Sequence, residues 1–135
     1  MDEEELERES DVLALEMLCD VDAPSRVRDA VRAIDGIGSS LGDAILIASE
    51  LVTNTLRQSA GSDARFIQIR VRKARDRLLI SVRDPDDCGH GARAAGASDP
   101  GAGGAGLWLV QRLAHSWGGE RRNGYRVWAE LQLAS

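Results

Sequence analysis

A carboxylate and a carboxamide lie one helical turn apart near the middle of the chain. Glu50 and Asn54 are four positions apart, so a helix would present both side chains in the same direction. An asparagine oxygen is a neutral ligand for Mg²⁺, and a nearby carboxylate can orient or deprotonate a nucleophile, which together suit phosphoryl transfer. An ordinary polar helix face explains the same spacing, because polar pairs four residues apart are common on helices.

Asp84 is a second candidate, because it directly follows an apolar run and opens a long segment rich in glycine and alanine. A side chain at such a strand end can meet a ligand at the edge of a sheet. There an aspartate could accept a hydrogen bond from the amino group of a base. The run Asp84-Pro85-Asp86-Asp87 is also good turn chemistry, which needs no ligand.

A glycine-rich run at residues 101–106 leads directly into the apolar residues Leu107-Trp108-Leu109-Val110. Backbone N–H groups are free at a helix N-terminus, so this junction predicts a cradle for an anion such as phosphate. The glycines also match the dinucleotide fingerprint G-x-G-x-x-G. We reject that interpretation because no strand precedes the run and too little chain follows it. A flexible linker is the remaining alternative.

The elements that must position these residues follow from the apolar pattern. A helix capped at Ser39-Ser40 and ending at Gly61 carries Glu50 and Asn54. The other expected elements are a strand at 12–21, a helix from near Pro24 to before Gly36, an antiparallel hairpin of strands 66–72 and 78–83, a helix from 107 to about 115, and strands 116–120 and 125–133 turning at Asn123-Gly124. This order predicts an α+β fold, a two-layer sandwich with a mixed, mainly antiparallel sheet and helices on one face.

Composition narrows the classes of function. The formal net charge of the 135 residues is -5, so nucleic acid and membrane surfaces are poor partners, although a single nucleotide remains allowed. Lys73 is the only lysine and lies outside any Walker motif. The two cysteines match neither a disulfide framework nor a zinc site, and no run of about 18 apolar residues is present. We therefore expect a cytoplasmic protein.

We expect one domain at residues 12–135, preceded by an acidic, flexible leader at residues 1–11. The three tryptophans fall within or beside apolar segments, so we expect core positions rather than a platform for stacking bases. They are Trp108, Trp117 and Trp128.

Taken together, the motifs resemble those of the GHKL (Bergerat-fold) ATPase superfamily, in particular its small serine-kinase anti-sigma factors. Glu50-Leu51-Val52-Thr53-Asn54 is similar to the N box, Asp84 to the aspartate of the G1 box, and Gly104-Ala105-Gly106-Leu107 to the G2 box. Order and spacing agree over roughly residues 12–133. The tail, with Val127-Trp128-Ala129-Glu130-Leu131, is similar to the closing strand of stand-alone actinobacterial-type members.

The resemblance implies a histidine-kinase-like ATPase domain that binds ATP and Mg²⁺, holds a sigma factor inactive, and phosphorylates a Ser or Thr of a STAS-type anti-anti-sigma protein. It also implies a homodimer. By this resemblance Glu50 is the general base, Asn54 the Mg²⁺ ligand and Asp84 the adenine reader. Arg57, on the polar stripe of the same helix, is assigned to the nucleotide site. The phosphate contacts implied by the resemblance are the backbone groups of Gly103, Gly104, Ala105 and Gly106, and Leu107 is assigned with them to the nucleotide site.

Three positions depart from the family pattern. Asp86 stands where glycine is common, Gln58 where histidine is common, and Arg126 where a threonine near the adenine is common. These departures motivate an alternative function, a non-catalytic regulatory module with degenerate or weak nucleotide binding that keeps the fold and acts through protein contacts alone. Retention of both Glu50 and Asn54 favours the kinase.

Overall fold

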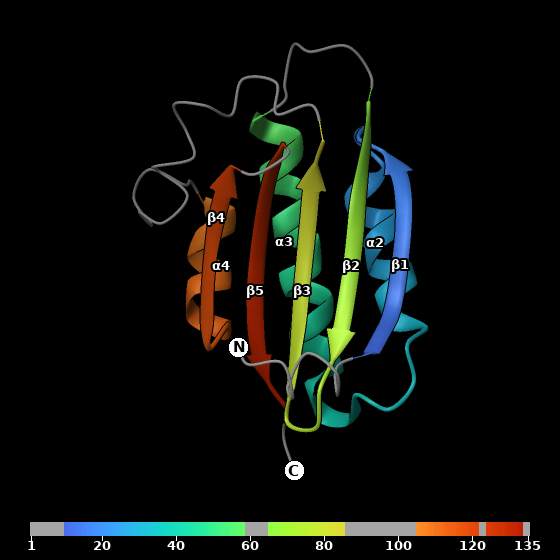
Figure 1. The fold of residues 1–135 in the computed structure, drawn as a ribbon, viewed down its shortest axis with the longest axis vertical. Coiled ribbons are helices and arrows are strands. Elements are labelled where there is room, and N and C mark those ends of the chain that lie inside the picture. The colour runs from blue at the N-terminus through green and yellow to red at the C-terminus, as the bar shows by residue number, and fades with distance from the viewer. Residues whose placement is uncertain (1–9, 59–64, 86–104, 122–123, 134–135) are drawn as a thin grey trace.

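The computed structural model describes residues 10–58, 65–85, 105–121 and 124–133. Figure 1 shows the elements in space. They are β1 (Ser10–Leu18), α2 (Ala23–Arg32), a short 3-10 helix η1 (Gly38–Ser40), α3 (Leu41–Gln58), β2 (Phe66–Lys73), β3 (Arg77–Asp84), α4 (Ala105–Leu113), β4 (Ser116–Arg121) and β5 (Tyr125–Gln132). Among these helices, none is both long and apolar enough to cross a membrane.

The five described strands form one sheet in the order β1-β2-β3-β5-β4. Each neighbouring pair is antiparallel, where we expected a mixed sheet. The three α-helices lie behind the sheet in the view of Figure 1 and cover one of its faces. The expected two-layer α+β sandwich is therefore confirmed.

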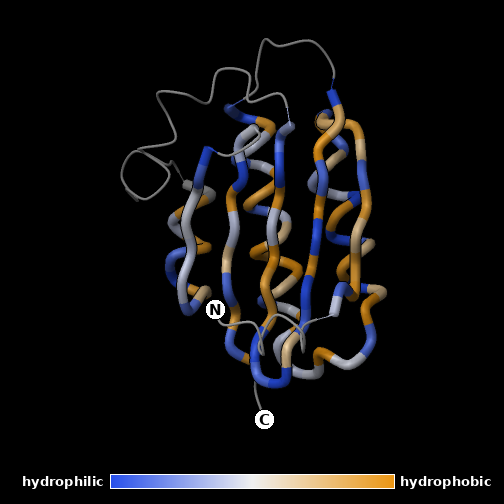
Figure 2. Tube along the Cα trace, in the orientation of Figure 1, coloured by the Kyte–Doolittle hydropathy of each residue, from blue (hydrophilic) through white to orange (hydrophobic). Residues whose placement is uncertain are grey.

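Alternating side chains explain why one face of the sheet is covered. In β2, Ile67, Ile69 and Val71 are buried against the helices, while Gln68 and Arg70 between them are exposed. Figure 2 shows the polar residues of this strand interrupting its apolar ones. Each such buried aliphatic side chain stabilises the fold by roughly 1.5–3 kcal/mol. We call the sheet face that the described helices leave uncovered the open face.

Helix α3 is the longest element and lies centrally behind the sheet (Figure 1), in contact with β3, α2 and α4. The expected helix is confirmed, with η1 forming a tight turn at its Ser39-Ser40 entrance. Its described part ends at Gln58, and the expected stop at Gly61 lies outside the described residues. Fully buried Ile47, Ala48 and Leu51 anchor it in the core.

The first strand is correctly predicted as a strand, but its boundaries differ. β1 begins at Ser10, so the last two residues of the expected leader belong to the sheet, and residues 1–9 lie outside the described part. β1 ends at Leu18 rather than at residue 21, because Asp20 organises a turn. Its carboxylate accepts hydrogen bonds from the Asp22 backbone N–H at 3.0 Å and from Arg26 Nη1 at 3.0 Å. The Arg26 contact lowers the pKa of Asp20.

The tryptophan prediction is wrong for two of the three side chains. Trp108 is 54% exposed, because α4 directs Leu107 and Val110 into the core instead, and Arg112 stacks over its ring at 5.0 Å. Trp128 alternates with buried neighbours in β5 and so lies on the open face, beside Gly118 of β4. Only Trp117 packs against the core, and it is partly buried.

Candidate functional site

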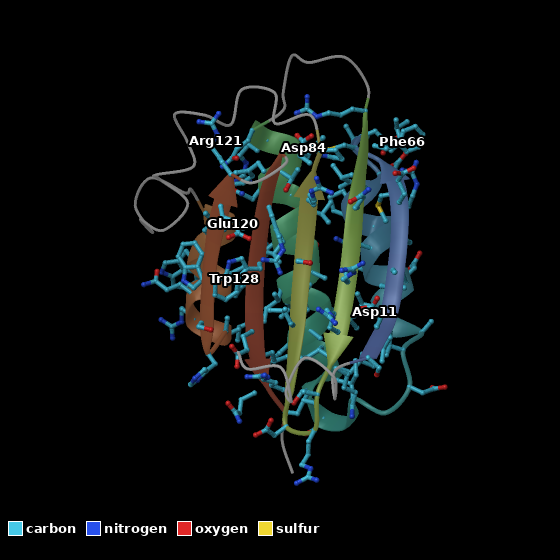
Figure 3. All side chains as sticks on the ribbon, viewed as in Figure 1. Asp11, Phe66, Asp84, Glu120, Arg121 and Trp128 are labelled. Atoms are coloured by element: carbon cyan, nitrogen blue, oxygen red, sulfur yellow. The ribbon has the colours of Figure 1, made fainter. Side chains whose placement is uncertain are left out.

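The elements that carry the candidate residues converge at one end of the sandwich (Figure 1). Helix α3 and strand β3 both end there, and strand β5 and helix α4 both begin there. Asp84, the last residue of β3, is the register partner of Tyr125, the first residue of β5. Figure 3 shows Asp84 at this end of the sheet. Features that are far apart in the sequence therefore meet at one place.

Buried polar side chains gather at this end, and we call four of them the polar layer: Asn54, Arg65, Asp84 and Tyr125. Their exposed fractions are 1%, 7%, 0% and 1%, respectively. Arg65, Asp84 and Tyr125 each continue the alternation of buried residues along their strands, so they lie on the helix-covered face of the sheet. Asn54 belongs to α3, which packs over β3 and β5. The polar layer thus closes the end of an otherwise apolar core.

Arg65 and Asp84 form an ion pair within the polar layer, with 2.9 Å between Arg65 Nη2 and Asp84 Oδ2. By the resemblance Asp84 is the adenine reader, and Arg65 is not among the residues that the sequence motifs indicate. A buried arginine beside a buried carboxylate compensates its charge, and removing either partner leaves the other charge uncompensated. The only sequence signal for Arg65 is its place in the alternation of β2. It lies two residues before Ile67, which lies two residues before Ile69, so the three side chains share one face of the sheet.

The amide of Asn54 is incompletely hydrogen bonded. Its Oδ1 accepts from Gln58 Nε2 at a long 3.4 Å, and its Nδ2 has no hydrogen-bond partner among the residues that the structure describes. The two amide orientations are related by exchange of O and N, so rotating both Asn54 and Gln58 would leave a buried oxygen unpartnered instead. A buried polar atom without a partner costs free energy, which a ligand, ion or water would recover.

Glu50 lies one turn before Asn54 on α3 and is half-buried. Partial burial raises the pKa of its carboxyl, while the positive charges of Arg57 and Arg28 act in the opposite direction. Arg28 reaches α3 from α2, where its Nη1 donates to Ser49 Oγ at 2.9 Å. A carboxyl with a raised pKa exchanges protons closer to neutral pH, which suits a general base.

The exposed Arg57 contributes charge rather than a buried contact. It lies on the last turn of α3, three residues after the buried Asn54. The expected polar stripe is therefore split, because Asn54 faces the core while Arg57 faces outward. A charge at this place can attract the phosphates of a nucleotide approaching the end of the helix.

The described part of the glycine-rich junction belongs to α4. Ala105 and Gly106 form its first residues, so the helix begins two residues earlier than expected. Leu107 is fully buried, and its side chain anchors α4 rather than contacting a ligand. The backbone N–H groups of this first turn have no partner within the helix and suit an anion. Gly103, Gly104 and Asp86 lie outside the described residues.

Arg126 does not belong to the polar layer. It lies between buried Tyr125 and Val127 and therefore faces the open side of the sheet, where its Nη1 pairs with Glu120 Oε1 at 3.1 Å. A hollow of about 490 Å³ lies on this open face, separate from the polar layer. It is lined by Ala14, Leu15, Glu16, Gln68, Ile69, Arg70, Ser81, Arg83 and Arg126. Arg126, one of the three positions that depart from the resembled pattern, therefore takes no part in the polar layer.

A metal held by protein atoms alone is not indicated. Within the described residues no three His, Cys, Asp or Glu side chains form a group that could hold a metal ion. Asn54 could supply one oxygen ligand, and Mg²⁺ commonly takes the rest of its ligands from phosphates and water. The donor set therefore fits Mg²⁺ only together with a phosphorylated ligand. In comparisons with known proteins, no family model matches this chain, and no curated protein sequence matches it significantly.

Proposed function

We propose that the chain binds the Mg²⁺ complex of a purine nucleoside triphosphate at the polar layer and transfers the terminal phosphoryl group to a protein Ser or Thr. ATP is the nucleotide that the resemblance implies. The observation that carries the proposal is the buried, incompletely bonded amide of Asn54 at the end of α3. A side chain that costs stability in the free protein is explained when a ligand completes its bonding.

Each neighbouring group has a role that its surroundings support. The Asn54 side-chain oxygen would hold Mg²⁺, and the first turn of α4 would hold phosphate oxygens through its backbone N–H groups. Glu50, with its raised pKa, would take the proton of the attacking hydroxyl. Bound Mg²⁺ would neutralise the phosphates. Asp84 would accept a hydrogen bond from the base.

The resemblance also sets the proposed partners. The kinase would hold a sigma factor inactive and phosphorylate a STAS-type anti-anti-sigma protein, in the cytoplasm and as a homodimer. Neither partner requires direct contact with nucleic acid or membrane. Light scattering of the purified chain measures the dimer directly, and a mass of one chain would contradict that part of the proposal.

The Arg65–Asp84 ion pair favours a second candidate, a non-catalytic regulatory module. Asp84 already has a cationic partner at 2.9 Å, so it can remain buried without a base to bind. In this alternative the polar layer only closes the core, and the chain acts through protein contacts.

Calorimetric titration with ATP and MgCl₂ separates the two candidates. The kinase proposal predicts binding by the native chain, loss of Mg²⁺-dependent affinity in Asn54→Ala, and binding without phosphoryl transfer in Glu50→Gln. Gln68→Ala is the matched control, because it removes an amide from the open face. No heat and no rise in melting temperature with either ATP or GTP at millimolar concentration would refute the kinase proposal and leave the regulatory module.

A further inference from the structure

Arg65 is buried with N–H donors that Asp84 does not satisfy. Its side chain is 7% exposed, yet Nε and Nη2 have no hydrogen-bond acceptor among the residues that the structure describes. The 2.9 Å approach of Nη2 to Asp84 is an ion pair by distance, in which the N–H bonds are not aligned with the carboxylate. Nε and Nη2 lie on one edge of the planar guanidinium and form a fork of two parallel donors.

A buried fork of two donors requires a ligand with two adjacent acceptors. Guanine presents this pattern, because its O6 and N7 both accept hydrogen bonds. Adenine presents N7 beside the N6 amino group, so one arginine N–H would face another donor and stay unpaired. A carboxylate complements guanine further, since N1–H and the N2 amino group can both donate to it.

We propose that Arg65 contacts the base and that the Arg65–Asp84 pair selects guanine over adenine. Arg65 donates from Nε and Nη2 to O6 and N7, while Asp84 accepts from N1–H and the N2 amino group. This inference rests on the proposed nucleotide site. It changes the base that the resemblance implies and leaves the roles of Asn54 and Glu50 toward the phosphates as proposed.

The fold places the two side chains close enough to contact two adjacent edges of one base. Arg65 immediately precedes β2 and Asp84 ends the adjacent strand β3, and both lie on the helix-covered face. They belong to the same buried layer as Asn54, at the end where α4 begins. The first turn of α4, which we propose to hold the phosphates, begins at this same end of the sandwich.

The test compares the affinities of the native chain for Mg·GTP, Mg·ATP and Mg·7-deaza-GTP by calorimetry. We expect GTP to bind about 10- to 100-fold more tightly than ATP, since one buried charged hydrogen bond has that effect. Loss of N7 in the deaza analogue should weaken binding by about tenfold. Arg65→Met should remove the preference for GTP, whereas Arg83→Met, an arginine on the open face, should preserve it.

The outcomes distinguish this inference from the proposed function. Equal or tighter binding of ATP than GTP by the native chain overturns guanine selection and leaves the nucleotide site standing. Equal binding of GTP and its 7-deaza analogue overturns the Arg65 contact, and this measurement needs no variant to fold. If neither triphosphate binds at millimolar concentration, the proposed function fails and the inference fails with it.

Discussion

Breaking the Arg65–Asp84 ion pair from one side should destabilise the fold strongly. The two side chains are 7% and 0% exposed, so removing one partner leaves a buried charge, at a cost of about 3–5 kcal/mol. The free energy of unfolding of a domain of this kind is about 5–15 kcal/mol. Asp84→Ala or Arg65→Met should therefore remove a large share of the stability and lower the melting temperature by about 10–20 °C.

Replacing both partners with apolar side chains should restore most of that loss. A buried ion pair exchanged for hydrophobic residues of similar volume is commonly neutral or stabilising, so Arg65→Met/Asp84→Leu should approach the native stability. The pair Arg32–Asp29 is a matched control, because it spans 2.8 Å but its side chains are 59% and 75% exposed. Asp29→Ala should cost at most about 1 kcal/mol.

Urea unfolding followed by tryptophan fluorescence and far-ultraviolet circular dichroism measures these differences as a double-mutant cycle. A buried pair predicts a large coupling energy between Arg65 and Asp84. If each single variant lowers the free energy of unfolding by less than about 1 kcal/mol, as loss of an exposed ion pair does, the reasoning is refuted. A double variant as unstable as the sum of the singles would refute it as well, because the two sites would then be independent.

Two further predictions concern the same end of the molecule. Gly124→Ala should destabilise the fold markedly in thermal melts, because Gly124 has φ +103° and a Cβ there would collide with the Asp84 carbonyl oxygen. Gly42→Ala, where nothing lies within 4 Å, should be neutral or stabilising, and equal melting temperatures for the two variants would contradict the first. Glu50→Gln should melt above the native chain at neutral pH. The raised pKa means that the folded state favours the protonated Glu50 carboxyl, so its stabilisation is present below the ordinary value of 4.5 and is lost as the pH rises through the raised pKa. A difference in melting temperature that is constant with pH would show that the Glu50 carboxyl is not responsible.

Sequence periodicity predicted the architecture because most elements carry a strong, local pattern. The alternation in Phe66–Arg72 and the long amphipathic segment of α3 each indicate one type of element and one buried face. The same rule applied to β5 would have placed Arg126 and Trp128 on the open face, since Tyr125, Val127, Ala129 and Leu131 alternate with them.

Other features depend on tertiary contacts and could not be predicted from local pattern. Burial of Arg65 depends on Asp84, which is brought beside it only when β2 pairs with β3. Exposure of Trp108 depends on which side of α4 meets α3, and an apolar run at the helix start does not specify this. The early end of β1 depends on the turn that Asp20 forms with Arg26.

We propose that the buried amide of Asn54 serves Mg²⁺-dependent nucleotide binding. The most direct measurement is the affinity of the native chain and of Asn54→Ala for ATP and for GTP, each with and without Mg²⁺. We expect the native chain to bind at least one triphosphate more tightly with Mg²⁺, and Asn54→Ala to lose this Mg²⁺ dependence while remaining folded. Equal affinity and equal Mg²⁺ dependence in the two chains would contradict it.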